Sequence, residues 1–322
     1  MNNSQYWYNP NLKQVFMKAL ITGGSGFIGS YITQELVKQN IATLVYDNFS
    51  TGDVNNLSSV SSKIHIIKAD VTDLEQLQAS MEGVNYVFHL AAQTSVTESL
   101  LDPFSTNQIN NTGTLNVLWA ALRAKVSRVI IASSCSVYGD SRQPPLQESY
   151  LPNPKSPYAA SKLIAEAFAE SFYHSYGLET ICLRYFNVYG LRQRADSDYA
   201  AVIPRFIECY RQKKSPQIYG TGLQSRDFVH VSDVARANIL AAMLPSSIVN
   251  NHRVFNIGTG IKTNLLELLD LIAKYTNYYL EPTFLPSRQG EIEHSCASPN
   301  LAQENLDFSA LVSLEEGIKT LL

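Results

Sequence analysis

The amino-acid sequence predicts an α/β fold, with a doubly wound parallel sheet followed by a smaller α/β lobe at the C-terminal end. Three observations predict it. From Lys18 to Ala132, short β-branched runs alternate with longer amphipathic stretches, which is typical of stacked βαβ units. A glycine-rich turn follows the first of these runs, and beyond Asn187 the alternation loosens. At 322 residues, the chain is long enough for a core domain and a second lobe.

The core domain is predicted to contain six strands. We place them at Lys18–Thr22, Thr43–Tyr46, Ile64–Lys68, Tyr86–His89, Arg128–Ala132 and Thr180–Leu183. Helices are expected between the strands, among them Phe27–Lys38, Phe104–Leu122 and, after a proline-rich loop, Tyr158–Tyr176.

The second lobe is predicted from discontinuous segments. These are helices at Ala201–Arg211, Ser232–Met243 and Asn264–Tyr275 and strands at Ile218–Tyr219 and Val254–Ile257. We divide the chain into an N-terminal extension (1–16), a core domain (17–187) and a mainly substrate-binding lobe (188–322), with segments around 226–257 as candidates to return to the core domain. A ligand is expected between the lobes, at the carboxyl ends of the strands.

Charge and composition narrow the functional classes. The net charge is -3, from 25 basic and 28 acidic residues without a run of one sign, which argues against a nucleic-acid partner. Four cysteines stand far apart without C-x-x-C spacing, so we expect reduced thiols, no metal site and a cytoplasmic protein. Residues 1–16 lack the apolar core of a signal peptide, and no stretch is apolar over the ~18 residues that span a bilayer, so no membrane partner is expected.

Gly23, Gly26 and Gly29 form a G-x-x-G-x-x-G turn between the first strand and the first helix. Glycines there allow a tight turn and a close approach to a pyrophosphate, while the helix start at Phe27 and Ile28 presents free N–H groups to the anion. Other glycine-rich turns match the same pattern, so the position between strand and helix carries the prediction. Residues 17–187 are therefore expected to form a Rossmann-type dinucleotide-binding domain.

Asp47 ends the second strand, 18 residues after Gly29, where a carboxylate can accept hydrogen bonds from the adenosine ribose. It would repel a 2′-phosphate and no arginine stands nearby, so NAD is favoured over NADP; a turn-starting role is the alternative. Further cofactor contacts are predicted in the loops after the second, third and fourth strands, at Asn48, Ser50, Thr51, Gly52, Asp70, Val71, Leu90, Ala91, Ala92 and Gln93.

Tyr158 and Lys162 are spaced i, i+4, which places them one turn apart on the same face of a helix. A lysine cation near the phenol would stabilise the phenolate and lower the tyrosine pKa, giving a general base for an alcohol proton. Ser134, at the end of the fifth strand, can hydrogen-bond the same substrate oxygen. An exposed Tyr/Lys pair is the alternative for the helix spacing alone; all three residues together point to catalysis.

From Met17 to Gly317 the chain resembles the extended short-chain dehydrogenases/reductases of the NAD-dependent epimerase/dehydratase family, especially UDP-hexose 4-epimerases that accept N-acetylated sugars. The resemblance lies in ITGGSGFIGS, DNFSTG, HLAAQTSV, SSCSVYGD, SPYAASK, LRYFNVYG, SRDFVHVSDVARA, FNIGTG and RQGE. It implies NAD as cofactor, a UDP-sugar as substrate and a homodimer formed through the helices near Phe104–Leu122 and Tyr158–Phe172, whose apolar faces could instead be buried within the monomer. It also implies a role in polysaccharide biosynthesis.

The residues after Ser134 bear on the reaction. In the related 4,6-dehydratases an Asp-Glu pair follows this serine, and in UDP-glucuronate decarboxylases a glutamate stands at the second position. Here Cys135 and Ser136 occupy the two positions, and neither supplies a carboxylate. The resemblance therefore favours 4-epimerisation through a transient 4-keto sugar, with Ser134 polarising the oxygen, Tyr158 as base and Lys162 holding the nicotinamide ribose.

The resemblance also implies a set of substrate contacts, with Tyr185 packed near the nicotinamide or, alternatively, as a core aromatic. The UDP contacts would be Asn187, Val202 and Tyr219, the diphosphate arginines Arg226 and Arg288, the uridine ribose acceptor Glu291, and the pocket residues Ser95, Ser136 and Ser295. A surface ion pair is the alternative for each arginine.

Ser295 lies seven residues after Arg288, where the resembling enzymes carry a bulky tyrosine if they are restricted to glucose and galactose. A serine there predicts acceptance of UDP-GlcNAc and UDP-GalNAc, alongside UDP-Glc and UDP-Gal. Two other functions stay open: a UDP-glucuronate/galacturonate 4-epimerase or another nucleotide-sugar oxidoreductase, and an NAD-loaded binding protein without turnover.

Overall fold

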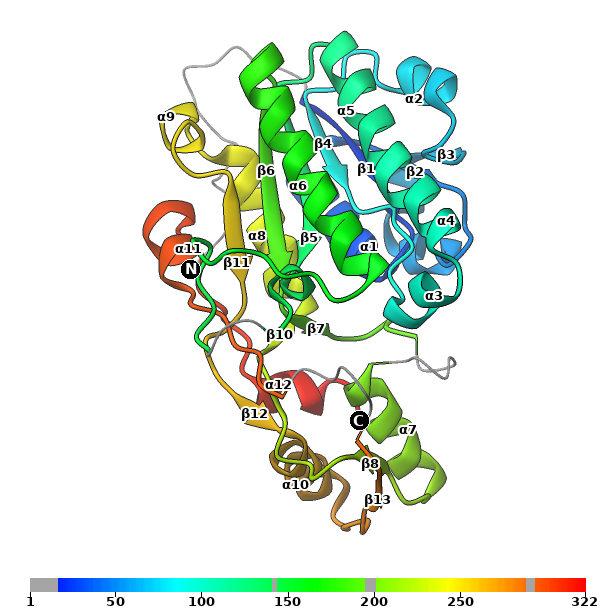
Figure 1. Cartoon of the computed structure of the whole chain (residues 1–322). Helices are drawn as coiled ribbons and strands as arrows, with labels where there is room; N and C mark the ends of the chain where they lie inside the picture. Colours follow the sequence, from blue (N-terminus) through cyan, green and yellow to red (C-terminus); the bar gives the residue numbers. More distant parts are fainter. Residues whose placement is uncertain (1–16, 141–143, 195–200, 288–292) are drawn as a thin grey trace.

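A seven-stranded, all-parallel sheet forms the centre of the chain (Figure 1), in the order β11-β6-β5-β4-β1-β2-β3. The computed structural model describes residues 17–140, 144–194, 201–287 and 293–322. The strands of the sheet are β1 Lys18–Thr22, β2 Ala42–Asp47, β3 Ile64–Lys68, β4 Tyr86–His89, β5 Arg128–Ser134, β6 Glu179–Tyr185 and β11 Val254–Ile257. This confirms the Rossmann-type doubly wound fold, because helices cover both faces of the sheet.

Two apolar layers hold the helices on the sheet. On one face, α1 (Phe27–Lys38) and α8 (Val231–Met243) pack with β1 and β6 around a core that includes Ile21 and Ile130. The other face carries α2 (Leu74–Ser80), α5 (Gly113–Arg123) and α6 (Pro157–Tyr176), which lie in front of the sheet in Figure 1. The sheet therefore has no face left to solvent, which explains its continuous apolar strands.

The helix α6 begins and ends where its sequence dictates. Ser156 caps its first turn by accepting from the Ala159 N–H, and Pro157 occupies the first helical position. Gly177 ends it in the left-handed conformation. These signals fix the twenty-residue helix that carries Tyr158 and Lys162.

A π-helical segment interrupts the helix expected over Phe104–Leu122. The chain runs from α4 (Pro103–Thr106) through η2 (Asn107–Thr112) into α5 without leaving helical backbone angles at the junctions. Three asparagines and a threonine in the η2 sequence NQINNT are poor helix formers. A π-segment inside an α-helix often marks a functional site.

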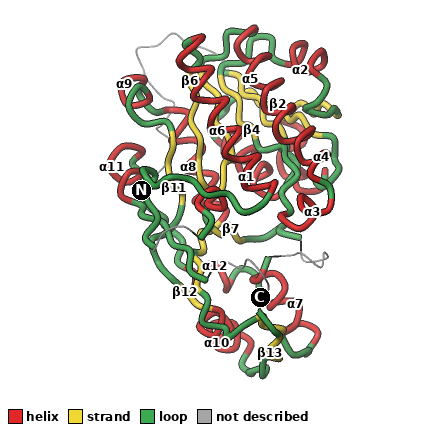
Figure 2. The backbone as a smooth tube through the Cα atoms, viewed as in Figure 1, coloured by secondary structure: helices red, strands yellow, loops and turns green. Residues whose placement is uncertain are grey.

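The smaller lobe lies below the sheet in Figure 2 and has its own core, which includes Phe206, Ile218, Leu268 and Ile318. It contains α7 (Val202–Gln212), α10 (Leu265–Thr276) and α12 (Leu314–Lys319) and two short sheets, β8 (Gln217–Tyr219) with β13 (Thr283–Leu285) and β9 (Ser225–Arg226) with β12 (Thr263–Asn264). A further pair, β7 (Asn187–Tyr189) with β10 (Phe228–His230), joins the lobes. The remaining elements are η1 Val54–Lys63, α3 Val96–Leu101, η3 Cys135–Tyr138, α9 Ser246–Val249 and α11 Asn300–Leu306.

Strand β11 and helix α8 pack with the core domain, the alternative that the sequence analysis gave for the segments around 226–257. β11 pairs with β6, Val254 opposite Cys182, and α8 packs against α1. The reason is burial: Phe255 and Ile257 are fully buried and complete the sheet's edge. Among the described residues, no helix is long and apolar enough to cross a membrane.

Candidate active site

The glycine turn is built for close contact with a ligand. A Cβ on Gly29 would lie 2.1 Å from the Gly23 carbonyl oxygen, and Gly23 has a φ of +70°, which favours glycine. No side chain caps the start of α1, so the first N–H groups at Phe27 and Ile28 stay open. The hydroxyl of Ser25 is buried without a hydrogen-bond partner among the described residues. This cradle fits a dinucleotide pyrophosphate.

Asp47 fastens the turn to the loop after β2. Its carboxylate accepts from the Ser25 N–H at 2.9 Å and the Phe49 N–H at 2.8 Å, and only 6% of the residue is exposed. A Cβ on Gly52 would lie 2.0 Å from the Ser25 hydroxyl, so the loop Asn48–Gly52 closes over the same spot. Asp47 thus starts the turn, and its contact with the adenosine ribose stays a prediction.

The third and fourth strands end beside this turn. Asn48 donates to Asp70 at 2.6 Å, the Val71 side chain packs against Gly113, and the N–H groups of Leu90 and Ala91 donate to the Thr22 hydroxyl. Four more residues predicted to contact the cofactor lie in the loops after β2 and β4: Ser50, Thr51, Ala92 and Gln93. The Gln93 side-chain oxygen is buried without a partner among the described residues, as expected of a group awaiting a ligand.

Ser134, Tyr158 and Lys162 meet at the carboxyl end of β5. The Ser134 hydroxyl hydrogen-bonds Tyr158 and accepts from the Ser136 N–H at 3.1 Å. The Lys162 ammonium donates to the Ala132 carbonyl at 2.9 Å and lies 5.9 Å from the centre of the Tyr158 ring. Helix α6 and strand β5 thus bring the three predicted catalytic residues together.

The pKa of Tyr158 differs from the sequence-based expectation. Burial raises it to about 12, opposed by the hydrogen bond from Ser134, whereas a lowering by Lys162 was expected. Burial likewise lowers the pKa of Lys162 to about 8. Desolvation sets the direction of both shifts, and the causes of the Tyr158 shift do not include the charge of Lys162, whose ammonium donates to the Ala132 carbonyl. Burial therefore favours the protonated phenol in the protein without cofactor.

Asn110, in the π-segment, is a site residue that the sequence reasoning missed. Its side chain accepts from the Gln93 N–H at 2.8 Å and donates to the Gln93 carbonyl and the Ser161 hydroxyl, both at 2.9 Å. It therefore ties the loop after β4 to α6, between the cofactor loop and Tyr158. The three asparagines and the threonine of NQINNT, all poor helix formers, were the available signal.

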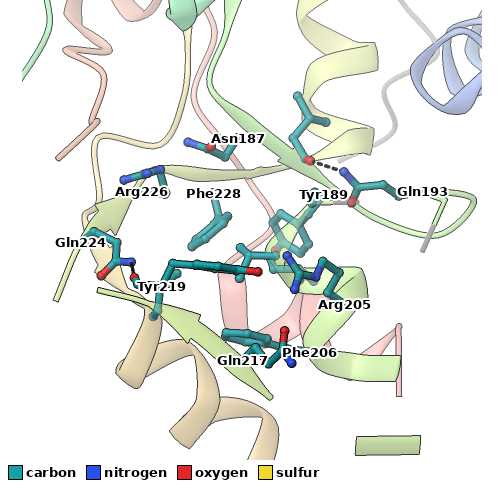
Figure 3. A pocket seen from close by; sticks show the side chains of 15 residues that line it. Asn187, Tyr189, Gln193, Arg205, Phe206, Gln217, Tyr219, Gln224, Arg226 and Phe228 are labelled. Atoms are coloured by element: carbon teal, nitrogen blue, oxygen red, sulfur yellow. Dashed lines mark hydrogen bonds between the residues drawn. The ribbon is translucent and has the colours of Figure 1, made fainter. Parts of the chain in front are cut away.

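A cavity of about 260 Å³ opens between β7, α7, β8 and β9 (Figure 3). It brings together four predicted substrate residues: Asn187, Val202, Tyr219 and Arg226. Figure 3 also shows Arg205, on the first turn of α7, facing this cavity. No sequence motif had marked this arginine. Arg288 and Glu291 lie outside the described residues.

The predicted pocket residues occupy different surroundings. Ser295 is 5% exposed and hydrogen-bonds the Cys135 thiol, so it lies beside the Ser134 turn. The Ser136 hydroxyl is buried without a partner among the described residues, while Ser95 caps α3 by accepting from the Glu98 N–H. Tyr185 lies in the core, and its hydroxyl donates to Asn238 at 3.0 Å, so only its ring remains for a cofactor contact.

Comparison with known proteins matches the chain over nearly its whole length. The sequence model of the NAD dependent epimerase/dehydratase family matches residues 19–258. The UDP-glucose 4-epimerase of Mycolicibacterium smegmatis is 36% identical over 307 residues, which cover 94% of this chain and 96% of that protein. More distant relatives include a UDP-glucuronate 4-epimerase at 30% and a UDP-N-acetyl-alpha-D-glucosaminuronate decarboxylase at 33% identity.

Solved structures agree in fold. The UDP-N-acetylglucosamine 4-epimerase from Methanobrevibacter ruminantium M1, in complex with UDP-N-acetylmuramic acid, aligns with a TM-score of 0.89 at 38% identity, covering 94% of this chain and 96% of that one. The Thermus thermophilus UDP-glucose 4-epimerase in complex with NAD aligns with a TM-score of 0.85 at 32% identity, covering 94% and 97%.

Proposed function

Because the chain belongs to the NAD-dependent epimerase/dehydratase family, we propose that it inverts C4 of a UDP-hexose, with UDP-GlcNAc and UDP-GalNAc as the preferred pair. The chain is an NAD-dependent enzyme of the UDP-sugar 4-epimerase kind. The observation that carries the proposal is the contact of Ser134 with Tyr158, next to Cys135 and Ser136. Cys135 and Ser136 stand where the related 4,6-dehydratases carry an Asp-Glu pair, whose carboxylates the elimination of water would need.

Tyr158, Ser134 and Lys162 each have a separate role in the proposed reaction. Bound NAD would supply the acceptor and donor of the hydride and a positive charge that favours the Tyr158 phenolate, and the cradle at Gly23 and Gly29 together with Asp47 would hold it. Tyr158 takes the 4-hydroxyl proton and later returns it to the oxygen. The Ser134 oxygen accepts from the Ser136 N–H, and its hydroxyl hydrogen, which bonds Tyr158, can be donated to the sugar oxygen when substrate binds. Lys162 remains available for a ribose hydroxyl.

Inversion requires that the sugar turn between the two hydride transfers. The UDP end must stay anchored meanwhile, and the cavity lined by Asn187, Tyr219 and Arg226 serves as that anchor. A guanidinium matches the diphosphate in geometry and charge. Binding energy from the nucleotide then holds the 4-keto sugar in the site until the hydride returns to its other face.

The small side chain of Ser295 supports the choice of N-acetylated sugars. Ser295 contacts Cys135, one residue from Ser134, so it lies close to the reacting centre. A serine leaves room beside C2 of the sugar that a tyrosine would fill. No described feature favours a C6 carboxylate, and uronic acids enter as competitors in the test.

A product analysis tests the proposed function. The purified protein is incubated separately with UDP-GlcNAc, UDP-Glc and UDP-glucuronate, and the products are separated by chromatography. We expect UDP-GalNAc to form fastest. If UDP-galactose forms readily and UDP-GalNAc does not, the substrate assignment is wrong; conversion of none of the three would overturn 4-epimerisation itself.

We further propose that two copies of the chain pair through α5 and α6. These helices lie side by side at the front of Figure 1. The centres of the Trp119 ring on α5 and the Tyr176 ring on α6 are 6.4 Å apart. Large apolar side chains stay exposed on and beside them: Leu101, Phe104, Leu115, Trp119, Ile164 and Tyr176. Exposed apolar side chains on α5, α6 and the neighbouring α3 and α4 favour association with a second copy.

A further inference from the structure

Three residues of α6, spaced i, i+4 and i+8, face the end of β5. Tyr158 contacts the Ser134 hydroxyl, Lys162 donates to the Ala132 carbonyl, and Glu166 accepts from the Ser133 hydroxyl at 2.5 Å. The helix is thus attached to three consecutive residues of one strand. The first two attachments belong to the catalytic group, and the third has no part in the proposed chemistry.

Glu166 is held in turn by Arg184 on β6. The arginine donates from Nε to one carboxylate oxygen at 2.9 Å and from Nη2 to the other at 2.7 Å. Both side chains are buried, with exposures of 5% for Arg184 and 7% for Glu166. The planar guanidinium fixes the carboxylate in two directions, which a single charge would not do.

Arg184 continues the chain of hydrogen bonds behind the catalytic turn. It donates to the Tyr138 hydroxyl at 2.9 Å, and Tyr138 donates to the side-chain oxygen of Asn256 on β11 at 2.7 Å. Tyr138 ends the short helix η3 that follows Ser134. The ion pair therefore touches both sides of Ser134: Ser133 before it and the η3 turn after it.

Stability alone is a weak reason for such a pair. A buried ion pair costs much of its attraction in desolvation, and an apolar replacement of similar volume is often as stable. The geometry offers a specific reason instead, because Glu166 lies one helical turn from Lys162 and accepts a hydrogen bond from Ser133, the residue before Ser134.

We propose that Glu166, oriented by Arg184, is a positioning residue. Its hydrogen bond to Ser133 fixes the position of α6 relative to β5 and so keeps the Tyr158 and Ser134 hydroxyls in contact. This inference rests on the proposed function, since it concerns the geometry of proton transfer from the 4-hydroxyl. Glu166 itself touches neither substrate nor cofactor. Loss of the attachment lets Tyr158 move relative to Ser134 while the nucleotide anchor, in the other lobe, stays unchanged.

Variants of three side chains test the proposal. Glu166→Gln removes the charge, and Ser133→Ala removes only the hydroxyl that links β5 to the pair, leaving the pair intact. Glu170→Gln is the matched control: it lies one turn further along α6, in a bidentate ion pair with Arg253 at 2.7 and 2.6 Å, and is 47% exposed. Each holoprotein is measured for melting temperature, bound NAD, kcat, KM and the pH dependence of kcat.

We expect kcat to fall in Glu166→Gln on the order of 100-fold, the scale of a misplacement of about 1 Å at a reacting group. Ser133→Ala should lose about fivefold to tenfold in kcat, the equivalent of one hydrogen bond. In both variants KM and bound NAD should stay near wild type, and Glu170→Gln should leave kcat unchanged.

Different results would separate the failures. If the wild type turns over a UDP-sugar and Ser133→Ala keeps full kcat while folded, the positioning role is wrong, whatever Glu166→Gln does. Equal losses of kcat in Glu170→Gln and Ser133→Ala would also overturn it, because the effect would then be general to α6. Absence of wild-type turnover would overturn the proposed function instead.

Discussion

The Thr22 hydroxyl lies 2.7 Å from Nδ1 of His89, and the other ring nitrogen lies 2.9 Å from the Thr114 hydroxyl. Thr114 donates to the Asn110 carbonyl at 2.5 Å, so it must accept from Nε2–H, which leaves Nδ1 to accept from Thr22. The ring is therefore neutral and bridges Thr22 on β1 to Thr114 on α5, which in turn donates to Asn110 in the π-segment.

Acid should destabilise the fold through this histidine. Burial lowers the His89 pKa from 6.5 to about 3, with the Lys162 charge adding to the effect. Below pH 6.5 the unfolded chain takes up a proton that the folded chain refuses, so stability falls as the pH drops toward 3. We expect a loss of about 2 kcal/mol between pH 7 and pH 5 from this group. Urea unfolding of His89→Gln should show a shallower pH dependence; parallel curves would contradict this.

Removal of the Tyr158 hydroxyl should stop turnover without unfolding the protein. Tyr158→Phe takes away the general base, whose contribution is typically about 10²–10⁴-fold in kcat. Bound NAD and the melting temperature should stay near wild type. Tyr173→Phe is the control, because the Tyr173 hydroxyl lies further along the same helix and donates to the Asn250 side chain at 2.7 Å. Retained activity in Tyr158→Phe would rule out its role as base.

Gly29→Ala should abolish cofactor binding. The added Cβ would lie 2.1 Å from the Gly23 carbonyl oxygen and 2.8 Å from the Gly24 Cα, so the turn must open. Gly177→Ala is the control: no atom of the described chain lies within 4 Å of the new Cβ, and only the strain of its φ of +72° remains, about 1 kcal/mol. NAD released on denaturation measures both. Full NAD content in Gly29→Ala would disprove the assignment of the cradle.

Ser295→Tyr should change the choice of sugar. The phenol would occupy the space beside Cys135, so we expect kcat/KM for UDP-GlcNAc to fall on the order of 100-fold while UDP-Glc is still epimerised. Steady-state assays with both substrates give the ratio. An equal decrease for the two sugars would mean that Ser295 does not line the C2 side of the pocket.

Trp119→Glu should separate the proposed pair of subunits. A charge in the centre of an apolar interface is costly to bury, so the variant should sediment as a monomer where the wild type sediments as a dimer. Leu223→Glu, at a residue 58% exposed in the small lobe, should leave the dimer intact. A monomeric wild type at micromolar concentration would contradict the pairing.

The strands, the glycine turn and the helix α6 of the core domain could be predicted from short stretches of the sequence. The β-branched runs, the glycine turn and the Ser-Pro start of α6 predict strands, cradle and helix because each depends on residues that are neighbours in the chain. The i, i+4 spacing of Tyr158 and Lys162 is likewise a property of a single helix. These predictions needed no knowledge of how the elements pack.

Only the tertiary structure decided the rest. The place of Val254–Ile257 at the edge of the large sheet, the bridge from Asn110 to Gln93 and Ser161, and the ion pair of Glu166 with Arg184 all join segments distant in sequence. The raised Tyr158 pKa belongs here too. Burial sets it, and burial depends on what the whole fold packs around a side chain, which the spacing of residues along the chain does not encode.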